Sequence, residues 1–113
     1  MHELSITQSI VEACNERAGG ARVLRVTLEV GRLSCVMPDA LRFCFDVVTE
    51  GTPLQGSTLE IITLPGLSRC RDCGAPVQML DLLSRCSCGS VNLERPQGGD
   101  QLLIKSIEIE EAA

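Results

Sequence analysis

The sequence predicts an α+β fold, with a small sheet of about three strands and two helices, interrupted by an inserted cysteine-rich module. Three observations support this prediction. A helical pattern followed by a strand pattern occurs twice in the first half of the chain. Four of the seven cysteines then fall within one short segment. After that segment, an alternating stretch predicts one more strand close to the end of the chain.

The first helix is expected from about Ser5 to Ala18. Apolar side chains recur there at every fourth position from Ile6 to Cys14, which is the spacing of one helix face. Ser5 and Gln8 match a capping box at its start. The two glycines that follow Ala18 are typical of the left-handed turn that ends a helix.

The remaining elements are predicted in the same way. Residues 24–30 (LRVTLEV) alternate apolar and polar side chains, as in a strand with one buried face. Pro38 suits the first turn of a second helix. The apolar stripe of that helix is expected to consist of Leu41, Cys44, Phe45 and Val48. Residues 57–64 and 102–110 predict two further strands.

Residues 66–96, which contain the clustered cysteines, show neither a helical nor a strand period. If the strand at 102–110 pairs with the earlier strands, this segment is an insertion rather than a tail. A lone final strand would expose an apolar edge. We therefore expect one domain formed by residues 1–65 and 97–113, and an inserted module at residues 66–96.

Charge and composition exclude several classes of partner. The 113-residue chain has a formal net charge of -5 and only 2% aromatic residues. Negative charge repels phosphate backbones and base stacking needs aromatic side chains, so nucleic acid is not an expected partner. No secretory signal opens the sequence, and no apolar stretch is long enough to span a membrane. The expected compartment is the cytoplasm.

The clustered cysteines form two close pairs, Cys70-x2-Cys73 and Cys86-x-Cys88, separated by twelve residues. Two thiolate pairs joined by a hairpin-sized loop suit tetrahedral zinc, so the module is predicted to be zinc-ribbon-like and to need its ion to fold. The second pair has one intervening residue, where most zinc knuckles have two. A redox dithiol and a rubredoxin-like iron site are the alternatives, disfavoured because no βαβ frame surrounds Cys70 and aromatic residues are missing from the module. The scattered cysteines are expected to pack as small core side chains: Cys14, Cys35 and Cys44.

His2 is the only histidine of the chain and lies next to its amino terminus. Taken alone, a terminal histidine usually has no role, because chain ends fray. Histidine at this position nevertheless favours retention of Met1, so that the terminal amine, the imidazole and the intervening backbone nitrogens can chelate one ion. Nitrogen donors in a plane suit Ni(II) or Cu(II), whereas zinc prefers the four thiolates. The chain would then hold two metal sites that differ in geometry.

Several parts of the sequence occur together: the opening Met1-His2-Glu3, the segments LEVGRLSCV and LRFCFDVV, the two cysteine pairs and the closing IKSIEIEE. In this combination the chain resembles the HypA/HybF family of nickel-insertion proteins. The resemblance extends over essentially the whole chain. It implies a nickel site made from the terminal amine, the imidazole and two backbone amides, contributed by Met1, His2 and Glu3. It implies zinc ligation by Cys70, Cys73, Cys86 and Cys88. The family usually has C-x2-C in the second pair, so Cys88 is displaced by one residue.

The resemblance implies delivery of nickel rather than catalysis, with zinc in a structural role. The implied acceptor is the large subunit of a [NiFe] hydrogenase, the usual helper is a HypB-type GTPase, and some members also serve urease. The Glu3 side chain is expected either to contact nickel or to lie as a favourable charge at the start of the first helix. Two other classes remain open: a zinc-ribbon interaction module without a nickel role, and a small thiol-redox enzyme. The sequence does not decide between a monomer and a dimer.

Overall fold

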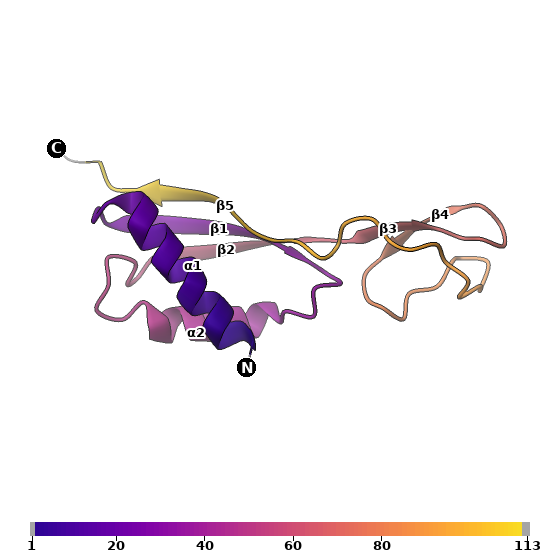
Figure 1. Ribbon diagram of the computed structural model, residues 1–113, viewed down its shortest axis with the longest axis horizontal. Coiled ribbons are helices and arrows are strands. Elements are labelled where there is room, and N and C mark those ends of the chain that lie inside the picture. Colours follow the sequence, from indigo (N-terminus) through magenta and orange to yellow (C-terminus); the bar gives the residue numbers. More distant parts are fainter. Residues whose placement is uncertain (1, 112–113) are drawn as a thin grey trace. The chain divides into compact units, whose positions relative to one another are not determined.

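A computed structural model describes residues 2–111, apart from the side chain of His2. Within this range the predicted α+β fold is confirmed, with two helices, a three-stranded sheet and a separate two-stranded sheet (Figure 1). The elements in chain order are α1 (His2–Ala18), β1 (Val23–Gly31), α2 (Pro38–Val48), β2 (Thr58–Leu64), β3 (Gly66–Arg69), β4 (Pro76–Met79) and β5 (Leu102–Ile109). Neither described helix is long and apolar enough to cross a membrane.

Strand β1 lies between β2 and β5 in the larger sheet (Figure 1). At its start, the Val23 N–H donates to the Pro53 carbonyl, 3.0 Å away and shortly before β2. Just after its end, the Arg32 N–H donates to the Leu64 carbonyl at the end of β2, at 2.7 Å. Strands β1 and β2 therefore run in the same direction, and α2 is the crossover between them, as parallel pairing requires.

Strand β5 pairs with the opposite edge of β1 in the antiparallel sense. The Gly31 N–H donates to the Gln101 carbonyl at 2.7 Å, and the Glu110 N–H donates to the Arg22 carbonyl at 2.9 Å. The end of β1 thus lies beside the start of β5, and the start of β1 lies beside the end of β5. Because β5 follows the cysteine segment and completes the earlier sheet, that segment is an insertion, as the sequence predicted.

The first helix begins earlier than expected. It starts at His2, so Ser5 lies within the helix and its prediction as the cap is wrong. The acidic side chain of Glu3 is in the first turn, where its negative charge interacts favourably with the positive end of the helix dipole. The Thr7 hydroxyl donates to the Glu3 carbonyl at 2.6 Å. The second helix begins at Pro38 as predicted.

The chain divides into two compact units. The first comprises Met1–Leu28, Val36–Ile62 and Leu103–Ala113, and the second comprises Glu29–Cys35 and Thr63–Leu102. Most of the buried apolar core belongs to the first unit: Ile10, Val11, Cys14, Val23, Val26, Leu28, Leu41, Phe45 and Leu54. Leu24 was expected on the buried face of β1 but is exposed, and Val23 is buried instead. The bounds of the inserted module at residues 66–96, and nickel binding by the domain of residues 1–65 and 97–113, stay predictions.

Two backbone segments of the second unit approach each other so closely that position 31 requires glycine. A Cβ atom on Gly31 would lie 2.0 Å from the carbonyl oxygen of Gly99. We expect Gly31→Ala to lower the free energy of unfolding by about 1–3 kcal/mol, the usual cost of overpacking. A suitable control is Gly51→Asn, because Gly51 has open space around its Cβ position and a φ of +75°, which asparagine tolerates. Equal urea midpoints for parent and Gly31→Ala would contradict this prediction.

Candidate metal centre

The second unit gathers four cysteine sulfurs into one cluster. The Sγ atoms of Cys70, Cys73, Cys86 and Cys88 all lie within 4.8 Å of one another. The Cys70 and Cys88 sulfurs are 3.8 Å apart, and those of Cys73 and Cys86 are 3.5 Å apart. Zinc–sulfur bonds of about 2.3 Å in a tetrahedron separate the sulfurs by about 3.8 Å. The spacing of the four thiols therefore fits a tetrahedral metal ion.

The first cysteine pair forms a tight turn between β3 and β4. The Gly74 N–H donates to the Cys70 carbonyl, and the Cys70 N–H donates to the Ala75 carbonyl, both at 2.9 Å. The Cys73 N–H points to the Cys70 sulfur at 3.5 Å. Gly74 has a φ of +78°, a conformation that favours glycine. This turn brings both sulfurs of the pair to one side of the chain.

The second pair repeats this turn with one residue fewer. The Gly89 N–H donates to the Cys86 carbonyl at 2.9 Å, and the Cys86 N–H donates to the Ser90 carbonyl at 3.0 Å. Gly89 has a φ of +91°. The shorter turn closes over three residues instead of four, so the single residue between Cys86 and Cys88 still places both sulfurs in the cluster. Displacement of Cys88 by one position is thus compatible with a four-sulfur site.

A polar contact that the sequence did not predict ties the two turns together. Asp72 lies within the first turn and accepts hydrogen bonds from the Ser90 hydroxyl and, at 3.3 Å, from the Asn92 side-chain amide. The same two bonds, that from Ser90 foremost, hold the pKa of the Asp72 carboxyl below its usual value. These bonds join the turn that carries Cys70 and Cys73 to the residues that follow Cys88. The sequence signal for this contact was weak: Asp72 lies between the cysteines of the first pair, and Ser90 and Asn92 follow shortly after the second pair.

Two of the thiols have a lowered pKa. The pKa of Cys70 falls to about 6, first because the Cys73 N–H donates to its sulfur. The pKa of Cys86 is also lowered, first by a hydrogen bond from the Cys88 N–H. A backbone N–H that donates to a sulfur favours the thiolate. In each pair, one thiol is therefore easier to ionise than an ordinary cysteine.

The other two thiols resist ionisation. The pKa of Cys73 rises to about 12: the Ala75 N–H favours the thiolate, but the Cys86 sulfur and the other nearby groups outweigh it. The pKa of Cys88 is raised in the same way, since the neighbouring Cys86 sulfur and desolvation outweigh a hydrogen bond from the Ser90 N–H. Four thiolates this close repel one another unless a cation lies between them. A bound dication would release the protons of both resistant thiols.

The scattered cysteines have three different environments. Cys14 is buried in the first unit, as predicted, and desolvation raises the pKa of its thiol. Cys44 is half-buried on α2. Cys35 is exposed and has a φ of +63°, so its prediction as a core residue is wrong. None of the three joins the four-sulfur cluster.

Of the predicted nickel ligands, the structure describes the backbone of His2 and the whole of Glu3, in the first turn of α1. Met1 and the side chain of His2 lie outside the described residues, whereas the backbone of His2 is already helical. The Glu3 carboxylate accepts a hydrogen bond from the Met37 N–H at 3.3 Å. The N–H groups of Glu3 itself and of Met37 hold the pKa of this carboxyl below its usual value. Glu3 thereby connects the start of α1 to the N-cap residue of α2.

A small α+β scaffold with four clustered thiols at the spacing of a tetrahedral site is typical of a metal-binding protein. The comparison with known families is more specific. The chain belongs to the HypA family: the family model described as "Hydrogenase/urease nickel incorporation, metallochaperone, hypA" matches residues 1–109. The resemblance noted in the sequence is thereby confirmed.

Individual relatives agree with this assignment. The chain is 55% identical to the hydrogenase maturation factor HypA of Nostoc punctiforme, over 98% of this chain and 97% of the relative. It is 46% identical to that of Geobacter metallireducens, over 97% and 100% of the two chains. The solution structure of the Ni metallochaperone HypA from Helicobacter pylori matches with a TM-score of 0.62 at 23% identity, covering 95% and 96% of the two chains. That likeness shows a shared fold.

Proposed function

We propose that this chain binds Ni(II) through its terminal amine, the His2 imidazole and the amides of His2 and Glu3, and delivers it during hydrogenase maturation. The observation that supports this proposal best is the start of α1 at His2. The first N–H groups of a helix have no carbonyl acceptor within the helix. The amide nitrogens of His2 and Glu3 can therefore bind a metal without breaking a helical hydrogen bond.

We assign the Glu3 carboxylate a positioning role rather than a ligand role. Its oxygen already accepts the Met37 N–H, and Met37 has no side-chain cap of its own at the start of α2. The carboxylate thus fixes the first turn of α1, next to the amide nitrogens that we assign to nickel. The Glu3 backbone amide can still serve as a ligand, because nickel would replace its hydrogen bond to the Glu3 carboxylate, while the bond from Met37 keeps that carboxylate in place.

In this proposal the four clustered cysteines hold a structural Zn(II). Zinc keeps all four positions of a tetrahedral thiolate site closed, which suits a structural ion and leaves no open position for catalysis. Nickel is the transported cargo, and the protein is a carrier rather than an enzyme. Thiolate ligands must remain reduced, which agrees with the cytoplasm as the expected compartment.

A role in hydrogenase maturation indicates which proteins would be partners of this chain. We propose the large subunit of a [NiFe] hydrogenase as the acceptor and a HypB-type GTPase as the helper. The family description includes urease alongside hydrogenase, so urease maturation proteins are a second group of candidate recipients. A carrier must bind nickel firmly enough to acquire it and loosely enough to release it, and protonation of the ligands offers one release route.

Nickel affinity is expected to fall steeply as the pH is lowered from 7.5 to 6. An imidazole ordinarily has a pKa of about 6.5 and an α-amine about 7.7–8.0, so over this range the protons gained by both groups compete with nickel. Together they predict a loss of roughly 50-fold or more. The measurement is a competition titration against a coloured nickel chelator, with untagged, zinc-loaded protein and the zinc content checked at each pH. A constant affinity over this interval would exclude joint ligation by amine and imidazole.

A further inference from the structure

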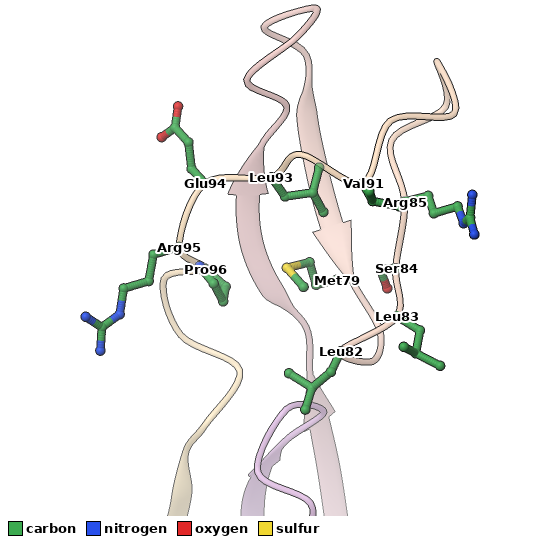
Figure 2. A pocket seen from close by; sticks show the side chains of 10 residues that line it. All are labelled: Met79, Leu82, Leu83, Ser84, Arg85, Val91, Leu93, Glu94, Arg95 and Pro96. Atoms are coloured by element: carbon green, nitrogen blue, oxygen red, sulfur yellow. The ribbon is translucent and has the colours of Figure 1, made fainter.

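The second unit carries an open apolar groove that the metal centre does not explain (Figure 2). Its volume is about 550 Å³, and its apolar lining consists of Met79, Leu82, Leu83, Val91, Leu93 and Pro96. Three of these side chains are largely in solvent, with exposed fractions of 64% for Leu82, 85% for Leu83 and 67% for Val91. Clustered apolar side chains that remain exposed mark interaction sites.

Leu82 and Leu83 lie on a turn that is held by hydrogen bonds. The Leu83 N–H donates to the Asp81 carboxylate at 2.8 Å. The N–H groups of Leu80 and Asp81 both donate to the Ser84 hydroxyl, at 3.1 and 3.3 Å. These bonds fix the turn that presents Leu82 and Leu83. A surface that is already ordered loses little conformational entropy when a partner binds.

The charges around the groove indicate the chemistry of its occupant. Arg85 and Arg95 lie on opposite sides of it, and their guanidinium groups point away from Met79 (Figure 2). Neither arginine has a hydrogen bond or an ion pair with any residue in the described part of the chain. Glu94 is the one acidic residue in the lining. An apolar groove between two unpaired arginines is complementary to aliphatic side chains flanked by carboxylates.

We propose that this groove binds a segment of a partner protein in which aliphatic side chains are bracketed by Asp or Glu residues. A nucleic acid is a poor match, because the lining contains no aromatic side chain and only two cationic ones. The inference goes beyond the proposed nickel function and does not depend on it. The groove consists only of residues from the second unit, whereas the proposed nickel ligands belong to the first.

The probe is a random peptide library displayed on phage, selected on the full-length, zinc-loaded protein. We expect the selected peptides to carry Leu, Ile or Val between acidic residues. The double substitution Arg85→Glu with Arg95→Glu should weaken binding of the best synthetic peptide at least about tenfold, a difference of about 1.4 kcal/mol. Leu83→Asp should weaken it as much. Selection of no peptide, or of peptides without acidic residues, would overturn the proposal.

Matched controls separate groove contacts from general charge and from zinc loss. Arg71→Glu makes the same charge change beside Cys70 as Arg85→Glu makes beside Cys86, but Arg71 does not line the groove. Leu67→Asp likewise changes an exposed leucine outside it. Both controls should keep peptide binding and zinc content. Equal weakening of peptide binding by the controls would refute the groove as the binding site. A dimer in analytical sedimentation that only Leu83→Asp dissociates would also refute the proposal, because a second copy of the chain would then cover the groove.

Discussion

Removal of zinc is expected to unfold the segment that contains the four cysteines. The buried cluster in this unit consists of Cys70, Val77, Met79 and Cys86, so two of its four members are proposed metal ligands. Without the ion, thiolates in the cluster repel one another and too few apolar side chains remain to order the turns. Structural zinc contributes about 10–16 kcal/mol in small thiolate sites. The loss should therefore exceed any effect of a single core substitution.

The measurement is a ¹H–¹⁵N spectrum of the full chain before and after a strong chelator. We expect the amide signals of residues 66–96 to collapse toward random-coil positions and to return when zinc is added. Cys86→Ser should produce the same collapse, whereas Cys35→Ser should not, because Cys35 is exposed and lies outside the cluster. Dispersed signals from the metal-free segment would show that zinc is not structural.

Replacement of His2 by glutamine is expected to remove tight nickel binding and leave zinc in place. The substitution deletes one nitrogen donor of the proposed chelate without changing the terminal amine or the backbone amides. Loss of a direct ligand should cost more than the 10–100-fold in affinity that is typical of losing an outer-shell partner. Isothermal titration calorimetry of zinc-loaded, untagged protein measures the nickel affinity of the parent and the variant.

A matched control for this substitution is Glu12→Gln, at an exposed position further along α1. It should bind nickel as the parent does. If His2→Gln also bound nickel like the parent, His2 would not be a ligand. The protein would then be better described as a zinc-ribbon interaction module in which the N-terminal histidine has no role.

The sequence predicted features whose signal is local or repeated over many residues. The spacing of Cys70, Cys73, Cys86 and Cys88 predicted one cluster, and the structure brings the four sulfurs together. The long alternation at 102–110 predicted a strand that completes the earlier sheet, and β5 pairs with β1. Pro38 marked the start of α2 correctly.

Other features depend on contacts that sequence patterns do not show. Helix α1 begins at His2 and not at Ser5, and the contact of Glu3 with Met37 links residues far apart in the chain. Strand β4 alternates buried and exposed residues over only four positions, too few for a recognisable period. Asp72 could not be assigned to the metal centre because its partners, which include Ser90, follow much later in the sequence.

The metal content of native, untagged protein tests the two-site description most directly. The protein is dialysed against both zinc and nickel, washed, and analysed beside a variant that carries one extra residue ahead of Met1. We predict bound zinc and nickel in equal amounts for the native chain, and zinc alone for the extended chain, whose displaced amine can no longer close the chelate with His2. Equal nickel in both proteins would contradict a nickel site built on the chain's own amino terminus.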